Sequence, residues 1–271
     1  MQETLERLLA LKGVLVLAWL AALFLGERLL PAAPRPAGPG WPRLCSNVIF
    51  WGLDSGLSVL AVLPVTVWAA QHALSWRPLW WGGGFGLIAD LVLLDGLIYV
   101  WHRLNHRAPL LWRFHSVHHL DRFLDSTTAL RFHFGEVLLS ALVRAGVIVL
   151  LAFPLTSVLA FEALLLMATL FHHSNLRLAP KLERALSRVI VTPSIHWVHH
   201  HRRQSDTDSN YASVLSLWDP LFRSRSPARR TRDLEIGVEG RDELPIWSLM
   251  WAPFASPTYA AERRAQSSRS S

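Results

Sequence analysis

Five long apolar segments dominate the pattern of hydrophobic and polar positions along the chain. A helix needs about 20 apolar residues to cross the ~30 Å hydrocarbon core of a bilayer. The segments near this length are Leu8–Leu25, Val48–Ala70, Gly84–Val100, Val137–Phe153 and Leu155–Phe171. Pro154 separates the last two segments and interrupts helical hydrogen bonding, so they predict a short hairpin. The pattern predicts an all-α, polytopic membrane protein with about five transmembrane helices.

The first apolar segment is predicted to be a retained membrane helix. It is preceded by Glu3 and Glu6, whereas a secretory signal peptide begins with basic residues. It is followed by Glu27 and Arg28, which make a poor cleavage site. Residues 31–43 are rich in Pro and Gly and predict a loop before the second span.

Basic residues are concentrated on one side of this topology. If the first long loop is cytoplasmic, the third and fifth spans both end on that same side. The stretches that follow these spans carry Arg103, Arg107, Arg113, Arg122, Arg131, Arg177, Lys181, Arg184, Arg188, Arg202 and Arg203. The opposite side carries mainly Arg7 and Arg77. The positive-inside rule therefore predicts that both stretches form a cytoplasmic helical cap.

Composition supports the membrane assignment. Hydrophobic residues make up 51% of the 271 residues and charged residues 17%, and the chain has 13 tryptophans. A soluble domain has nearer a quarter charged residues. The net charge of +7 is spread among apolar runs, which favours a membrane partner and argues against nucleic acid. The single cysteine, Cys45, excludes an internal disulfide and a thiolate metal site, so any metal is held by histidine and oxygen.

Histidines gather in three short clusters within the predicted cap. The clusters are "HRLNH" (residues 102–106), "HSVHH" (115–119) and "HWVHH" (196–200). Residues three and four apart share one face of a helix, so each cluster presents its imidazoles to one side. Eight histidines exceed the four ligands of a tetrahedral zinc ion. The clusters therefore predict a di-metal site.

Two other interpretations fit histidines of this kind. A lone histidine near a membrane surface is usually an ordinary interfacial residue, and His72 and His201 fit that description. The clusters also fit a membrane carrier or sensor for zinc or nickel, without redox chemistry. Transporters, however, place their ligands near the bilayer midplane, and these clusters lie beyond the ends of the spans.

The clusters and their surroundings resemble the fatty acid hydroxylase/sterol desaturase superfamily of integral membrane di-iron enzymes. The motifs that carry the resemblance are "DGLIYVWHRLNH", "HSVHH", "RFHFGE", "FHHSN", "TPSIHWVHH" and "NYASVLSLWDPLF", over residues 95–222. The chain departs from the family pattern at Phe134, where proline is frequent, at Ala212, where glycine is usual, and at Arg223 and Ser224, where Gly-Thr is usual. No departure affects a histidine of the three clusters.

The resemblance implies a membrane-bound oxygenase with two iron ions and O2 as co-substrate. The implied iron ligands are His102, His106, His115, His118, His119, His173, His196, His199 and His200. No catalytic side chain is implied apart from these ligands. His172 is expected to point away, and His133 is either a further ligand or an outer partner beside Glu136. The implied reaction hydroxylates or desaturates a C–H bond of a lipid-like substrate, a sterol, acyl chain or related lipid. A separate electron-transfer protein supplies two electrons.

Several polar residues are candidates for supporting the ligands. Asp95 and Tyr99 share a helical stripe with His102, so they are expected either to orient an imidazole or to bond another helix. The other candidates for an outer role are Glu136, Asn175, Asn210 and Asp219, of which the last two are expected to brace the cap. Arg144 and Glu162 lie at similar depth on the two arms of the hairpin and are predicted to pair.

The chain divides into three predicted regions. Residues 1–83 contain N-terminal membrane helices and a linker, residues 84–223 the hydroxylase-like catalytic domain, and residues 224–271 a polar extension. Within the extension, "LPIWSLMWAPF" is expected either on the membrane surface or packed on the body, and "AERRAQSSRSS" as a disordered tail. The Ala-, Leu- and Arg-rich composition favours a bacterial plasma membrane.

Overall fold

The computed structural model describes residues 2–37 and 40–255, and over these ranges the regular structure is helical. The predicted all-α class is confirmed, and β structure in the described part is limited to isolated bridges. The helices are α1 (Gln2–Leu29), α2 (Trp41–Leu57), η1 (Ser58–Val62), α3 (Leu63–Gln71), α4 (Gly83–Arg107), α5 (Pro109–His119), η2 (Ser126–Leu130), α6 (Phe134–Leu151), α7 (Leu155–His173), α8 (Pro180–Leu186), α9 (Pro193–His199), α10 (Gln204–Thr207), α11 (Trp218–Leu221), α12 (Ile246–Trp251) and η3 (Ala252–Phe254).

Four helices among the described residues are long and apolar enough to cross a membrane. They are Trp41–Gln71, Gly83–Arg107, Phe134–Leu151 and Leu155–His173. The first of these runs through α2, η1 and α3, and its π-helical turn η1 lies just before Pro64, which cannot donate a helical hydrogen bond. The protein is thus an integral, multi-pass membrane protein, and the second to fifth predicted spans fall on these helices.

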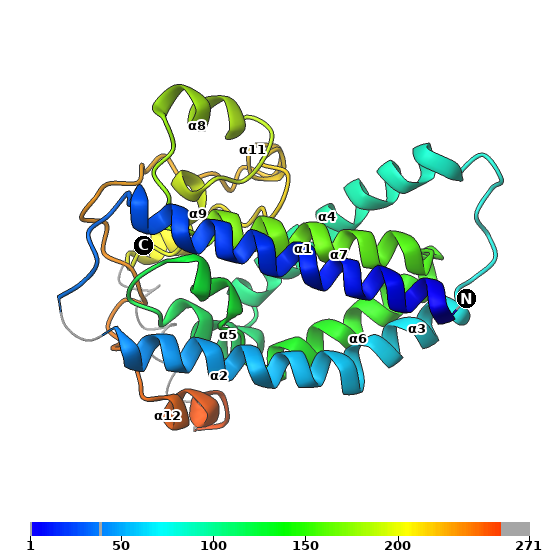
Figure 1. Ribbon diagram of the computed structural model, residues 1–271, viewed down its shortest axis with the longest axis horizontal. Helices are drawn as coiled ribbons and strands as arrows, with labels where there is room; N and C mark the ends of the chain where they lie inside the picture. The colour runs from blue at the N-terminus through cyan, green and yellow to red at the C-terminus, as the bar shows by residue number, and fades with distance from the viewer. Residues whose placement is uncertain (1, 38–39, 256–271) are drawn as a thin grey trace.

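The first predicted span falls on α1, which runs beside α7 (Figure 1). The indole Nε1 of Trp19 donates to the carbonyl of Met167 at 3.0 Å. Leu23 is buried with Leu170 in the same apolar cluster. Whether α1 is itself a fifth span stays a prediction.

The hairpin between α6 and α7 forms as predicted. Ala152 adopts a left-handed conformation (φ 54°) that ends α6, and Pro154 is the N-cap of α7. The Arg144 guanidinium lies 3.3 Å from a carboxylate oxygen of Glu162, so the predicted pair is confirmed. An opposite charge at the same depth spares each group the cost of an unpaired charge among apolar helices.

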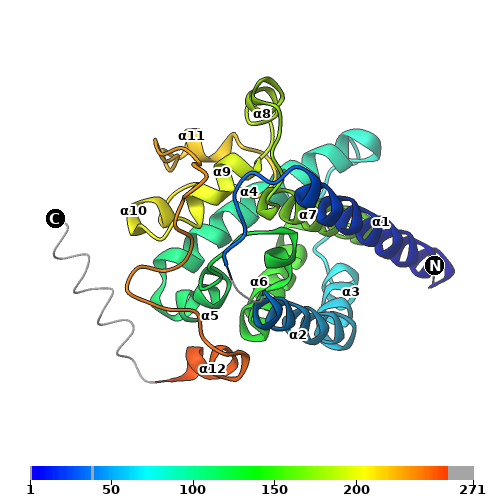
Figure 2. The same cartoon turned by 60° about the vertical axis from the view of Figure 1, so that its left-hand side comes forward.

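The histidine-bearing segments, which include α5 and α9, meet at one end of the long helices, and α8 lies at the same end (Figures 1 and 2). Two buried networks tie α1 and α2 to this end. Arg43 of α2 binds the carboxylates of Asp121 and Asp125 at 2.6–2.9 Å. Glu27 of α1 accepts from the backbone N–H groups of Ser126 and Asn175 at 2.9–3.0 Å. The N-terminal helices therefore brace the loops between the histidine clusters.

The C-terminal segment, which includes α12, also packs at this end of the molecule. In α12, Leu249 is fully buried and shares an apolar cluster with Phe50 of α2 and with residues of α5 (Figure 2). Trp247 and Trp251 remain about 70% exposed. The helix therefore packs on the body through one face, as one of the two expectations held, and presents tryptophan on the other; its position on the membrane surface stays a prediction. The predicted tail at residues 261–271 lies outside the described residues.

Candidate metal centre

Four helix ends bring nine of the histidines together. The last two turns of α4 supply His102 and His106, the last turn of α7 supplies His173, and α5 and α9 with its C-cap supply the remainder. Pro109 and Pro193 each occupy the first turn of a short helix, where proline is tolerated because that N–H has no intrahelical acceptor. Two prolines thus fix where the second and third clusters begin to coil.

The nine imidazoles form two buried groups. The first group comprises His102, His106, His115, His119 and His199, and the second group comprises His118, His173, His196 and His200. Within each group the candidate ligand nitrogens all lie within 4.8 Å of one another. Adjacent residues of one cluster enter different groups, because neighbours on a helix point about 100° apart.

Three rings of the first group are oriented by acceptors behind them. His102 Nδ1 donates to the Tyr211 carbonyl at 2.8 Å, and His199 Nδ1 donates to the Ser209 carbonyl at 2.6 Å. His115 Nδ1 lies 2.8 Å from a carboxylate oxygen of Glu136. An oxygen without hydrogen only accepts, so each Nδ1 carries a proton and each Nε2 is the ring nitrogen turned toward the centre.

Two rings of the second group are oriented in the same way. His118 Nδ1 lies 3.2 Å from the Arg131 carbonyl and His173 Nδ1 lies 2.7 Å from the Thr169 carbonyl. Their Nε2 atoms are only 3.0 Å apart. His173 Nε2 also lies 3.0 Å from His196 Nε2 and 3.2 Å from His200 Nε2. One bare nitrogen cannot receive hydrogen bonds from all these neighbours, and two facing lone pairs repel.

A metal ion in each group fits this chemistry. Ligands about 2.1 Å from one ion are ~3.0–3.4 Å apart at angles of 90–109°, the spacing found between these nitrogens. His199 Nε2, which faces the centre because Nδ1 donates to the Ser209 carbonyl, is buried without a hydrogen-bond partner. Burial, and then neighbouring histidines, lower the pKa of His118, His119, His196 and His200 well below the usual value. The rings are therefore neutral, the form that binds metal.

The remaining histidines lie outside both groups. His172, expected to point away, directs Nδ1 to the Ser213 carbonyl at 3.1 Å. His133 uses both ring nitrogens: Nδ1 accepts from the Gly135 N–H as the N-cap of α6, and Nε2 donates to the Met250 carbonyl. His133 therefore joins the start of α6 to α12, and the two groups are complete without it.

Glu136, a candidate for an outer role, contacts one of the nine histidines. One carboxylate oxygen accepts from His115 Nδ1 and, at 3.2 Å, from the Asn105 amide. Asn105 was missed by the sequence reasoning, although it lies inside "HRLNH", one helical turn after His102. Its position between two clustered histidines was the available signal.

Asp95 and Tyr99 do not touch an imidazole in the described structure. Asp95 accepts from the backbone N–H groups of Val214 and Leu215 and from the Trp218 indole. This is the alternative in which Asp95 bonds another element. Tyr99 shares a hydrogen bond of 2.8 Å with the Ser224 hydroxyl.

Two other candidates, Asp219 and Asn210, hold the backbone around the centre. Asp219 accepts from the N–H groups of Tyr211 and Ala212 at 2.8 and 3.1 Å. Asn210 donates to the Ile195 carbonyl and has a left-handed backbone, φ 51°. Asn210 stands between Ser209 and Tyr211, whose carbonyls hold His199 and His102. These two side chains therefore fix the direction of two ligand rings. Asn175 instead fastens the loop after α1, through two hydrogen bonds with Ala33.

A cavity of about 380 Å³ leads from both histidine groups into the membrane-spanning part. Its walls come from α2, α4, α6 and α7, and His102, His115, His118 and His173 border one end. The paired Arg144 and Glu162 also line it. A volume of this size lies in the range of ligand pockets. The centre is thus accessible from a space between helices that cross the bilayer.

Comparison with known proteins identifies relatives. A family model described as fatty acid hydroxylase matches residues 87–224. The ornithine lipid hydroxylase OlsE of Rhizobium tropici is 28% identical over 257 residues, 90% of this chain and 75% of its own length. The alkylglycerol monooxygenase of Danio rerio is 30% identical over 148 residues, 55% of this chain and 30% of its own. A cholesterol 25-hydroxylase-like protein of Danio rerio is 32% identical over 141 residues, half of this chain and 53% of its own.

No solved structure matches the chain. The family model covers just over half of the chain, including every histidine of the two groups. The predicted resemblance is therefore confirmed. The chain belongs to the fatty acid hydroxylase family and is an integral membrane oxidoreductase of the lipid hydroxylase class.

Proposed function

We propose that this chain is a di-iron monooxygenase that hydroxylates a C–H bond of a lipid drawn from the bilayer. The observation that carries the proposal is the pairing of two buried histidine groups with a cavity between membrane-spanning helices. The groups offer five and four nitrogens. A site built for zinc alone needs four.

The nine histidines would hold the two ions. Iron bound there would supply activation of dioxygen, with two electrons from outside. The chain's own residues orient the rings, exclude water and position the substrate. Backbone carbonyls and Glu136 keep the Nδ1 protons on the outer side of the rings and the Nε2 lone pairs on the inner side. Burial of every ring excludes bulk water, and the cavity walls position the substrate chain beside the centre.

A carrier or sensor for zinc or nickel is the alternative from a different class. Carriers must release their metal, which requires ligands that rearrange. Here most of the rings are fixed by hydrogen bonds from behind, and the rings of both groups are at least nine-tenths buried. These features favour a resident cofactor over a transported ion.

The names of the relatives limit the chemical class of the proposed substrate. They include hydroxylases or monooxygenases of an ornithine lipid, an alkylglycerol and a sterol-type lipid. Each name denotes an apolar molecule with a polar group. We infer a substrate of that general kind, and hydroxylation rather than desaturation, because the relatives named here are hydroxylases and monooxygenases.

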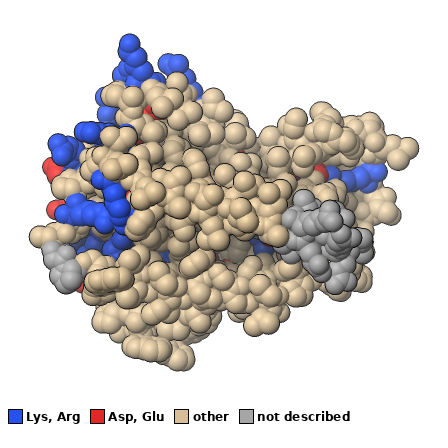
Figure 3. All heavy atoms as spheres, viewed as in Figure 1, with Lys and Arg blue, Asp and Glu red and all other residues tan. Residues whose placement is uncertain are grey.

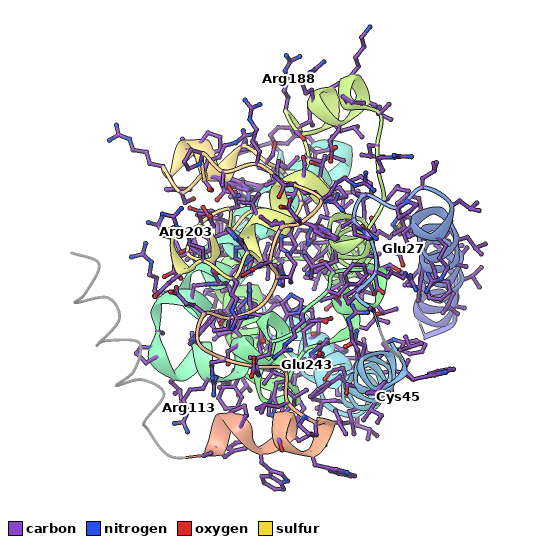
Figure 4. All side chains as sticks on the ribbon, turned by 90° about the vertical axis from the view of Figure 1, so that its left-hand side faces the viewer. Glu27, Cys45, Arg113, Arg188, Arg203 and Glu243 are labelled. Atoms are coloured by element: carbon purple, nitrogen blue, oxygen red, sulfur yellow. The ribbon has the colours of Figure 1, made fainter. Side chains whose placement is uncertain are left out.

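A separate electron-transfer protein would dock at the histidine end, on the cytoplasmic side of a five-span topology. Lys and Arg gather at this end of the molecule, whereas the face over the long helices carries few (Figure 3). Arg188 and Arg203 point outward there (Figure 4). Replacing Arg202 and Arg203 by Gln is expected to slow reduction several-fold and to leave metal content unchanged, because such patches act on association rate. Unchanged reduction by every acidic carrier tested would contradict this docking site.

The first experiment is the metal content of the purified protein, wild type beside His199→Ala. About two irons per chain, reduced in the variant, together with a hydroxylated lipid in cells that express the wild type, would support the proposal. Zinc or nickel after growth in iron-replete medium, with no iron taken up on anaerobic reconstitution, would overturn it in favour of the carrier.

A further inference from the structure

The last described helices, α12 and η3, expose a stripe of aromatic side chains. Trp247, Trp251 and Phe254 are 71%, 69% and 53% exposed. They lie at positions i, i+4 and i+7, which share one face of a helix. The stretch that contains them, "IWSLMWAPFA", has no ionisable side chain. Contiguous exposed apolar surface of this kind marks a contact with a membrane or with another protein.

The depth of the stripe follows from its contacts with α6. This helix has 18 residues and is about 27 Å long, just enough for the ~30 Å hydrocarbon core, so its first turn lies at one boundary of that core. His133, the N-cap of α6, donates through Nε2 to the carbonyl of Met250 in α12 at 3.0 Å. The ring of Phe254 stacks on Phe134, the first residue of α6, with centroids 6.2 Å apart. The stripe therefore lies at the level where a membrane-spanning helix enters the bilayer.

The stripe also faces away from the helix bundle. Leu249, on the opposite face of α12, is fully buried in the apolar cluster that contains Phe50 of α2. At the same level of α2, Val48 and Ile49 are 47% and 43% exposed. Figure 1 shows α12 beside α2 and not beyond its end, and the surface there shows no Lys or Arg among the described residues (Figure 3). The surroundings of α12 are thus those of a membrane-spanning helix near its boundary.

We propose that α12 and η3 form an interfacial anchor, whose aromatic stripe inserts into the headgroup region of the leaflet on the histidine side. Tryptophan favours that region because its ring is amphipathic. Arg113, beside α12 in Figure 4, donates to the carbonyl of Ala255 and brings a cation to the edge of the stripe. Aromatic and basic side chains together are typical of such anchors. His133 then couples the anchor to the start of α6, a role that needs no metal.

Spin labelling at Ser248 tests the anchor while both tryptophans remain. Ser248 is an exposed residue of α12. The full chain with Cys45→Ser and Ser248→Cys is labelled with a nitroxide, loaded with Zn²⁺, which has no unpaired electron, and placed in phospholipid nanodiscs. Collision of the nitroxide with O2, which concentrates in the bilayer, is compared with collision with a neutral nickel chelate, which stays in water. Zinc content of each labelled protein verifies the fold.

Two reference positions calibrate the measurement. Leu60, in η1 within a membrane-spanning helix, is 81% exposed, so a label at Leu60→Cys reports the lipid chains. The Asp242 side chain is 77% exposed and pairs with Arg122, so a label at Asp242→Cys reports water. We expect the ratio of O2 to nickel collisions at position 248 to lie several-fold above that at 242 and below that at 60.

A pair of substitutions makes the result specific to the aromatic rings. Trp247→Ser with Trp251→Ser, in the protein labelled at 248, is expected to lower the collision ratio toward that of position 242. Trp80→Ser is the matched control, because Trp80 is 67% exposed but lies before α4, at the opposite end of the spans. It should leave the ratio at 248 unchanged.

Three results overturn the anchor. The first is a label at 248 that collides mainly with the nickel chelate, which would leave the stripe in water. The second is a label shielded from both reagents, which would place protein, such as a second copy of this chain, over the stripe. The third is a ratio that the paired serine substitutions do not change. None of these outcomes depends on iron uptake or turnover, so failure of the proposed hydroxylase function leaves the anchor standing.

Discussion

The two histidine groups differ in what holds their rings. In the first group, Nδ1 of His102 and of His199 bonds a backbone carbonyl, but Nδ1 of His115 bonds the side chain of Glu136. In the second group, the partners of His118 and His173 are both backbone carbonyls. A carbonyl stays in place whatever side chain its residue carries. The first group is therefore the one that a single side-chain change can loosen without removing a ligand.

The strongest way to separate the groups is to remove one ligand from each. His199→Ala and His173→Ala are each expected to lose about one of two metal ions. The affinity loss should exceed the ~10–100-fold that loss of an outer partner causes. Metal analysis and turnover measure both effects. Loss of both ions in either variant would show that the groups do not act as separate sites.

Acidification acts on both groups together. Burial lowers the pKa of His118, His119, His196, His199 and His200 well below the ordinary value of 6.5. The unfolded chain binds protons near that value while the folded chain does not, so stability falls as the pH drops below about 6.5.

Metal release and thermal midpoint are therefore measured between pH 8 and 5. We expect one release step shared by the two groups, with stability falling across the same window. Two well-separated steps would instead reveal that the carboxylate behind His115 changes the response of the first group. A stability that is constant down to pH 5 would contradict the buried, neutral state of these rings.

Glu136→Gln tests the comparison directly. The amide keeps the size of the side chain but removes the charge behind His115. We expect affinity for one metal to fall about 10–100-fold and affinity for the other to stay unchanged. Competitive titration with a chelator separates the two constants. Equal weakening of both would mean that the carboxylate acts through the general field of the site and not through one ring.

The smallest expected effect lies at the far end of the cavity. Glu162→Ala leaves the Arg144 charge unpaired among apolar helices, at a cost on the order of 2 kcal/mol, less than the 3–5 kcal/mol of a fully buried pair. The double variant with Arg144→Ala should recover part of that loss, as judged by thermal inactivation midpoints. Additive losses would contradict the pairing, and altered metal content in either variant would link this end to the histidines.

Local patterns in the sequence were sufficient to predict the helices and to predict that the histidines come together. Apolar length and the spacing of histidines are properties of short stretches, and the second to fifth predicted spans fall on helices long and apolar enough to cross a membrane. The division into groups could not be predicted. "HSVHH" sends His115 and His119 to one group and His118 to the other, although all three share one helix. That division depends on how α5 lies against α4, α7 and α9.

The partners behind the rings were also beyond the sequence, for a chemical reason. Every residue has a carbonyl, so no residue type marks Tyr211, Ser209, Arg131 or Thr169 as acceptors. Asp95 was a reasonable candidate by helical position, yet its carboxylate holds the backbone at Val214 and Leu215. It supports the centre from one layer further out, through the segment that presents Tyr211.

Asn210 has a consequence for genetics. Its left-handed backbone joins the two carbonyls that aim His199 and His102, and few residues other than glycine and asparagine adopt that conformation readily. A random mutagenesis screen for lost metal would therefore report position 210 among the ligands, although its side chain bonds Ile195 and Ser226 and, among the described residues, no imidazole. Glycine would be the replacement that survives selection, and a β-branched residue the one that is eliminated.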